Sequence, residues 1–172
     1  MQRCFAFALV ALMACEGAPP EPNPGRPAPP PADSTARAPS VTPTVRFLRA
    51  GEGELSAIVR RERETAAKEG RTLLVYVGAP WCEPCTRFHQ AAEAGQLEGK
   101  LPPLLLLELD RDVDETRLGE AGYLSRLIPL FAAPAEDGRS GPHRMEGSIK
   151  GAGAVDEILP RLKALVGQAK GP

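Results

Sequence analysis

Two cysteines stand three residues apart, directly after the only tryptophan of the chain, in the stretch "APWCEPC" that ends at Cys85. A Cys-x-x-Cys pair can exchange disulfides, hold a metal or form a structural disulfide. A structural zinc site usually takes four ligands, which disfavours it here, since the chain has only two other cysteines, both near its N-terminus, and two histidines. Covalent haem needs a histidine after the second cysteine, where Thr86 stands. A disulfide closing so short a loop would stabilise little, so redox chemistry is favoured.

The position of the pair supports the same interpretation. Cys82 follows a predicted buried strand, Thr72–Gly78, and begins a predicted helix that runs to about Ala94. Unpaired N–H groups and the helix dipole at that start would stabilise its thiolate, which makes Cys82 the expected nucleophile. Cys85 lies one turn further along and can resolve a mixed disulfide. Pro84 suits the first turn, where proline costs little.

The remaining pattern predicts an α/β domain over residues 45–168, with a mixed central sheet and helices on both faces. The last predicted helix has Asp156 as its N-cap, which would place Pro160 in the first turn. The other expected elements are an edge strand at 44–48, a helix at 54–69, a strand at 104–109, a short helix at 114–121, and strands at 127–134 and 143–149 joined by the turn 135–141.

The net charge does not indicate a particular partner, because 21 basic residues nearly balance 22 acidic ones. This balance argues against a nucleic-acid partner, and we expect a monomer. Residues 1–14 carry Arg3 and then a short apolar run, which is typical of a secretion signal peptide. Such a run is too short to span a bilayer as a helix.

The signal peptide ends in Leu12-Met13-Ala14-Cys15, which resembles the lipobox of bacterial lipoproteins. That resemblance implies that Cys15 becomes the lipidated N-terminus, with palmitate-like chains that anchor the protein in a membrane of the cell envelope, facing the periplasm. A plain signal peptide cut nearby, for instance after Ala18, is the alternative. Cys4 would be removed with the signal in either case.

Residues 15–44 hold ten of the 19 prolines and almost no apolar side chains. They cannot bury enough surface to fold, so they are expected to form a disordered tether between the lipid and the domain. Residues 169–172 are expected to be a flexible tail.

The segment Trp81-Cys82-Glu83-Pro84-Cys85 resembles the Trp-Cys-x-Pro-Cys motif of the thioredoxin family, in the family's strand-to-helix context. Further along, Ile128-Pro129 stands where that family has its cis-proline, and Gly147 or Gly151 matches its late glycine. The resemblance covers residues 45–168 and implies a thioredoxin-like fold.

The same resemblance implies an enzyme, a thiol:disulfide oxidoreductase with Cys82 and Cys85 as its catalytic residues and no bound cofactor. Trp81 and Pro84 would line the substrate groove with Ile128 and Pro129, and the main chain of Ile128 would pair with the substrate. The expected partners are protein disulfides, a thiol donor in the membrane or periplasm, and the lipid bilayer. A proline inside the motif is typical of reductants, so a reductase is expected.

One position departs from the family pattern. Thioredoxins have a buried acid five residues before the motif tryptophan, and Tyr76 stands there. The proton of Cys85 would then leave through water, Glu83 or Glu108.

Two other function classes stay open at this point. A metal-handling lipoprotein could bind copper or zinc through Cys82, Cys85 and His89, since His89 is four residues after Cys85 on the same helix. A redox-inert interaction module could also keep this fold.

Overall fold

The computed structural model describes residues 43–169. The predicted signal peptide, Cys15, nearly all of the tether and the last three residues lie outside this part of the chain. Within 43–169, no helix is both long and apolar enough to cross a membrane.

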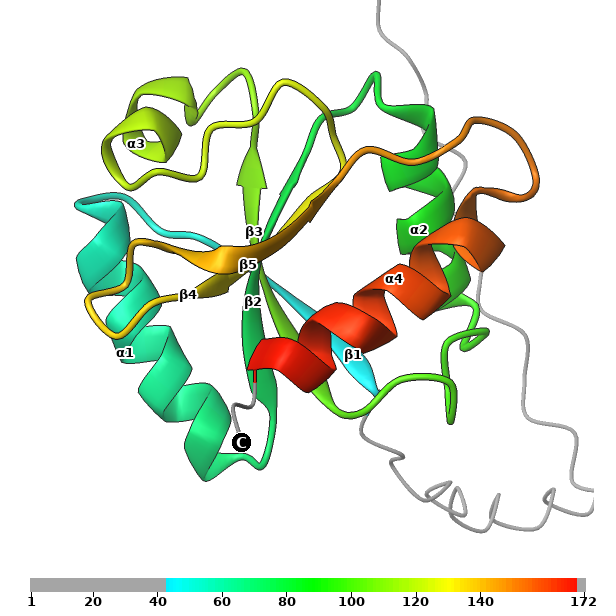
Figure 1. The fold of residues 1–172 in the computed structure, drawn as a ribbon, viewed down its shortest axis with the longest axis horizontal. Helices are drawn as coiled ribbons and strands as arrows, with labels where there is room; N and C mark the ends of the chain where they lie inside the picture. Colours follow the sequence, from blue (N-terminus) through cyan, green and yellow to red (C-terminus); the bar gives the residue numbers. More distant parts are fainter. Residues whose placement is uncertain (1–42, 170–172) are drawn as a thin grey trace, which may run out of the picture. The chain divides into compact units, whose positions relative to one another are not determined.

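The described chain alternates strands and helices before it ends in a hairpin and a long helix (Figure 1). The strands are β1 (Val45–Arg49), β2 (Thr72–Gly78), β3 (Leu104–Asp110), β4 (Leu130–Pro134) and β5 (Ser140–Glu146). The helices are α1 (Leu55–Lys68), α2 (Glu83–Glu93), α3 (Glu115–Glu120) and α4 (Ala154–Ala169).

These strands form one five-stranded sheet in the order β1-β3-β2-β4-β5. Strand β3 pairs in parallel with β1 and β2, whereas β4 runs antiparallel to β2 and to β5. Strand β2 is therefore central, with a hydrogen-bonded neighbour on each side. Its residues from Leu73 to Gly78 are all buried, as expected for a strand covered on both faces.

Helices cover both faces of the sheet, with α1 and α3 on one side and α2 and α4 on the other (Figure 1). Alternate residues of β2 supply the two cores: Leu74 and Tyr76 pack with α2 and α4, while Val75 and Val77 pack with α1 and α3. The expected α/β fold, with a mixed central sheet and helices on both faces, is confirmed.

Two boundaries differ from the sequence expectation. Strand β5 begins and ends three residues earlier than expected, and Gly147, just after it, has a φ of +66° that breaks the extended backbone. Helix α4 begins at Ala154, so Pro160 lies inside the helix and Asp156 lies in its first turn. Burial of Ala154 against the core extends the helix, and the exposed ring of Pro160 is tolerated at the cost of one helical N–H.

The β4–β5 hairpin contacts α1 at Gly138, which provides a stability test. Gly138 has a φ of +82°, and a Cβ there would overlap the carbonyl oxygen of Ser56 in α1. Gly138→Ala should therefore lower the free energy of unfolding by about 2 kcal/mol or more. Gly51→Ala is the matched control, because no atom lies near that Cβ, and it should change stability by less than about 1 kcal/mol. Denaturant titration measures both, and equal effects would contradict the close contact between hairpin and helix.

Candidate active site

The junction between β2 and α2 presents the two cysteines. Cys82 is the N-cap of α2, with extended backbone, and its sulfur accepts a hydrogen bond of 3.3 Å from the Cys85 N–H. Its carbonyl oxygen accepts the Thr86 N–H at 3.0 Å, and its own N–H donates to Ala79 at 3.0 Å. A sulfur thus takes the place that a serine or aspartate oxygen usually has at a helix start.

The predicted catalytic pair comes together as a disulfide. The sulfurs of Cys82 and Cys85 are 2.01 Å apart, and their Cα atoms are 5.2 Å apart. Both residues are almost fully buried, with exposed fractions of 4% and 3%. Pro84 lies between them in the first turn of α2. An N–H at that position would have no partner within the helix, so proline loses no helical hydrogen bond there.

Each cysteine lines a different cavity. Cys82 lines a groove of about 430 Å³, which we call the outer groove, bordered by the loop before β4 and the loop after β5. Cys85 lines a cavity of about 370 Å³ between α2 and the ends of β2 and β3, which we call the polar cavity. No residue lines both.

The outer groove has an apolar rim. Trp81, Leu127 and Ile149 line it and are exposed by 64%, 60% and 55%. Of the residues predicted to bind substrate, Trp81, Pro84 and Ile128 line this groove beside Cys82. Large apolar side chains exposed together around a cleft mark a surface that can accept another chain.

Pro129 is placed differently from the other predicted groove residues. The Ile128–Pro129 peptide bond is cis, as expected, but Pro129 is buried and does not line the groove. Its carbonyl oxygen accepts the N–H of Gly147 at 2.9 Å, which ties the loop before β4 to the loop after β5. Pro129 therefore supports the groove wall on which Ile128 lies.

Trp81 is held by a residue that sequence inspection missed. Its indole Nε1–H donates a 2.7 Å hydrogen bond to the Asp112 carboxylate. Asp112 lies in the turn after β3, where its N–H donates to the Asp110 side chain at 2.8 Å. Asp112 lies 31 residues from Trp81 in the sequence, so no local pattern linked the two residues. The only sequence signal was the group of aspartates that follows a predicted strand.

Glu83, inside the motif, has its charge compensated. Its carboxylate accepts from Arg87 at 2.8 Å and from the Gly151 N–H at 3.2 Å. The Arg87 hydrogen bond is the main reason that the pKa of Glu83 is lowered, with smaller contributions from the Arg87 charge and the Gly151 N–H. Glu83 lines the outer groove and not the polar cavity. Of the two carboxylates considered as proton routes for Cys85, Glu108 alone shares a cavity with that residue.

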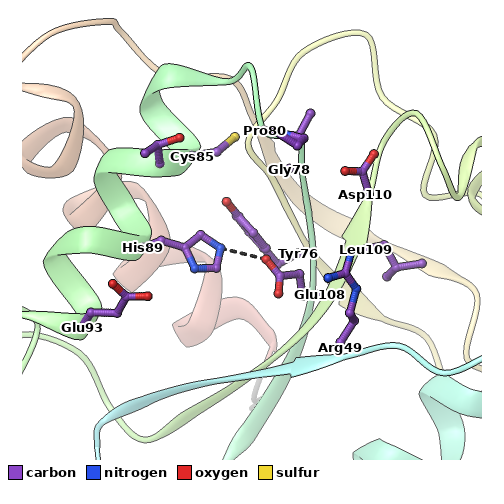
Figure 2. A pocket seen from close by; sticks show the side chains of 12 residues that line it. Arg49, Tyr76, Gly78, Pro80, Cys85, His89, Glu93, Glu108, Leu109 and Asp110 are labelled. Atoms are coloured by element: carbon purple, nitrogen blue, oxygen red, sulfur yellow. Dashed lines mark ion pairs between the residues drawn. The ribbon is translucent and has the colours of Figure 1, made fainter. Parts of the chain in front are cut away.

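The polar cavity holds titratable side chains from both the sheet and α2. Figure 2 shows His89 reaching from α2 to Glu108 on β3, with 2.9 Å between His89 Nε2 and Glu108 Oε1. The His89 ring stacks on the Phe47 ring, with 3.9 Å between the ring centroids. It also packs edge-on against the Tyr76 ring, with 5.4 Å between the centroids. Sequence inspection considered His89 only as a metal ligand, since the register of β3 was needed to bring Glu108 to it.

Tyr76 stands five residues before Trp81, where the resemblance to thioredoxins would place a buried acid. Its side chain is 1% exposed, and its hydroxyl has no hydrogen-bond partner among the described residues. Burial, and secondarily the charge of Glu108, raise the pKa of Tyr76 well above its ordinary value. The phenol therefore stays protonated and remains a hydrogen-bond donor.

The metal-handling alternative would use Cys82, Cys85 and His89 as ligands. Residues 43–169 contain no group of three or more His, Cys, Asp or Glu side chains that could hold a metal ion. His89 contacts Glu108, and the two cysteine sulfurs are bonded to each other.

Comparisons with known proteins place few limits on this site. No protein-family model matches the chain, and no curated protein matches it. Among solved structures, the thioredoxin of Trichomonas vaginalis aligns with it at a TM-score of 0.44 and 18% sequence identity. That alignment covers 74% of this chain and 98% of the thioredoxin. The interpretation of the site therefore rests on its own geometry.

The Trp81–Asp112 hydrogen bond can be tested directly, because Trp81 is the only tryptophan. Asp112→Ala should release the indole, so the fluorescence anisotropy of the full-length chain should fall. Stability should change by only about 1 kcal/mol, since the bond is exposed. Glu136→Ala, an exposed acidic position elsewhere, is the control and should leave the anisotropy unchanged. An Asp112→Ala anisotropy equal to that of the control would show that Asp112 does not hold the ring.

Proposed function

We propose that this chain is a thiol:disulfide oxidoreductase that works by exchange through Cys82 and Cys85. The observation that carries the proposal is the disulfide at the start of α2, with its Cys82 side in an open groove. A helix start stabilises a thiolate, and a thiolate is the species that attacks a disulfide. The sulfurs themselves carry the electrons, so the exchange needs no bound cofactor.

In the reducing direction, the Cys82 thiolate attacks one sulfur of a substrate disulfide. A Cys82–substrate disulfide forms, and the other substrate sulfur leaves as a thiolate that takes up a proton. The Cys85 thiol loses its proton and attacks Cys82, which restores the disulfide and releases the second substrate thiol. The substrate gains two electrons and two protons, and the enzyme loses them.

The outer groove fits a protein disulfide better than a small polar one. Its rim carries the exposed Trp81, Leu127 and Ile149, which can cover apolar residues that flank a substrate cysteine. Glu157, also at the groove, is paired with Arg161, so this carboxylate adds little unpaired charge. By the family resemblance, the main chain of Ile128 would pair with the substrate backbone.

We further propose that the enzyme acts as a reductase in the cell envelope and is re-reduced by a thiol donor in the membrane or periplasm. The proline in the motif favours this direction, which the donor then determines together with the compartment. The signal at 1–14 and the lipobox cysteine Cys15 favour a lipid anchor on a bacterial membrane. The tether at 15–44 would hold the domain away from the bilayer.

The exchange mechanism predicts a trapped intermediate. Full-length Cys85→Ser, expressed in a bacterial envelope, should form mixed disulfides through Cys82, because the resolving thiol is missing. These adducts should appear on non-reducing gels and disappear with dithiothreitol. Reduction of insulin by dithiothreitol should slow at least about 100-fold relative to the wild-type chain.

Cys82→Ser is the matched control, since it keeps the buried thiol and removes the expected nucleophile. It should form no such adducts. Equal adducts from both variants, or none from either, would refute the exchange mechanism. Stoichiometric copper or zinc that protects both thiols of the wild-type chain would favour the metal-handling alternative instead.

The anchor makes a separate prediction. In a bacterial host fed an alkyne-tagged palmitate, the wild-type chain should be labelled and recovered with membranes. Cys15→Ser should carry at least about tenfold less label than the wild-type chain. It should also leave the membrane fraction, because stable attachment needs the acyl chains. Cys4→Ser should keep both the label and the membrane, since this residue lies in the discarded signal. Undiminished labelling of Cys15→Ser would refute the anchor and leave the exchange chemistry untouched.

A further inference from the structure

The polar cavity meets the disulfide at Cys85, the buried sulfur that must gain and lose a proton in each cycle. We propose that the Tyr76 hydroxyl and the His89 imidazole, held in place by Glu108, form the proton-exchange site of Cys85. This inference rests on the proposed exchange function and names the groups that serve its second sulfur. In the alternative arrangements, a carboxylate alone or bulk water would take the proton of Cys85.

Cys85 needs such a site because its charge appears in a buried place. When a thiol reductant attacks the sulfur of Cys82, Cys85 leaves as a thiolate. A residue only 3% exposed has little contact with water, so an uncompensated thiolate there is costly. A donor aimed at the sulfur lowers that cost, and a proton source removes the charge.

Tyr76 supplies the donor. Its hydroxyl is buried, has no partner among the described residues and lines the cavity that Cys85 lines. Figure 2 shows the hydroxyl pointing from β2 toward Cys85 on α2. Gly78 leaves room for this oxygen, because a Cβ there would lie 2.9 Å from it. A buried hydroxyl without a partner costs free energy in the oxidised state, which a bond to the Cys85 thiolate would recover.

His89 supplies the proton carrier. It lies four residues after Cys85 on α2, so the two side chains share one helix face. Its side chain is 27% exposed and lines the same cavity, so it can contact both solvent and the interior. Histidine is the side chain best suited to exchange protons near neutral pH. Stacking on Phe47 and the 2.9 Å contact with Glu108 fix the orientation of the ring.

The sheet register explains how Glu108 serves both groups. Tyr76 on β2 pairs directly with Glu108 on β3, so the carboxylate lies beside the tyrosine and in reach of His89. A carboxylate that contacts one ring nitrogen fixes the orientation of the imidazole. Glu108 is therefore a positioning residue that acts through His89.

The other charged side chains that line the polar cavity come from three different elements. Arg49 enters from β1, Glu93 from the end of α2 and Asp110 from β3. Asp110 accepts hydrogen bonds from the main chain of Asp112 and Val113, so it belongs to the turn after β3. Glu93 lies two helical turns beyond Cys85, and α4 contributes no residue to this cavity.

The steps balance. A reductant thiolate attacks Cys82, its sulfur bonds to Cys82, and the Cys85 thiolate leaves with the electron pair and accepts a bond from Tyr76. The His89 imidazolium then gives its proton to Cys85 and becomes neutral. A second reductant thiolate attacks the reductant sulfur of the mixed disulfide, which oxidises the reductant and releases Cys82 as a thiolate. In the opposite half-cycle neutral His89 accepts the Cys85 proton, and the resulting thiolate attacks the Cys82–substrate disulfide.

The first test measures Cys85 alone. In full-length Cys82→Ser, tryptic peptide 72–87 contains no other cysteine, so its alkylation by iodoacetamide between pH 5 and 10 reports the Cys85 thiolate. Adding Tyr76→Phe keeps the ring and removes the hydroxyl. This change should raise the pH midpoint of Cys85 alkylation by about one pH unit. That shift means about tenfold slower alkylation at pH 7.

Tyr123→Phe is the matched control. Tyr123 is also fully buried, but its hydroxyl donates to the Gly138 carbonyl at 2.9 Å on the other side of the sheet. This variant loses a hydroxyl and should leave the Cys85 midpoint in place. An unchanged midpoint in Tyr76→Phe, or equal shifts in both tyrosine variants, would overturn the role of Tyr76.

The second test follows turnover in the chain with both cysteines. His89→Gln should lower the rate of insulin reduction by dithiothreitol at pH 7 at least about tenfold and flatten its dependence on pH. His143→Gln, at an exposed position of β5, should match the wild type. A His89→Gln pH profile parallel to that of the wild type would overturn the role of His89. A wild-type chain that does not reduce insulin would refute the proposed function, whereas the Cys85 midpoint is measured without turnover.

Discussion

The placement of Cys82 at the first residue before α2 is the constraint on which the rest of the site depends. Strand β2 is buried and hydrogen-bonded on both edges, so the point where it delivers the chain to α2 is fixed by the sheet. At that point the Cys82 sulfur accepts the Cys85 N–H, and the Cys82 carbonyl accepts the Thr86 N–H. One residue therefore caps a helix and carries a reactive atom, so the geometry of the sulfur follows from the geometry of the fold.

From that junction the two sulfurs meet unlike surroundings. Cys82 borders a groove with the exposed apolar side chains Trp81, Leu127 and Ile149. Cys85 borders a cavity with Tyr76, His89 and Glu108. Because no residue lines both spaces, a partner chain could occupy the first while protons move through the second. This separation suits a reaction in which one sulfur bonds to a partner and the other exchanges a proton.

Elements outside the junction hold these two spaces in shape. The Pro129 carbonyl accepts the Gly147 N–H, which joins the walls of the outer groove. Gly151 donates to Glu83 and thereby links the loop before α4 to the first turn of α2. On the other side, Phe47 from the edge strand β1 covers the ring of His89. Even the peripheral strand thus has a part in positioning the site.

Local patterns determined much of this protein. The apolar run of β2 and the cysteines at a helix start were predicted from sequence, because each depends on neighbouring residues and on the period of burial. The cis bond between Ile128 and Pro129 was expected only from the resemblance to the thioredoxin family. The start of α4 was not, since burial of Ala154 in the core outweighed the local preference for a cap at Asp156.

Long-range contacts were decided only by the tertiary structure. Trp81 bonds Asp112 across 31 residues, and Gly151 bonds Glu83 across 68. The β2–β3 register places Glu108 beside Tyr76 and within reach of His89. A sequence pattern states which face of a strand a residue occupies, but not which strand lies next to it or in what register. The cysteine pair was therefore visible in the sequence, whereas the groups that surround it required the assembled sheet.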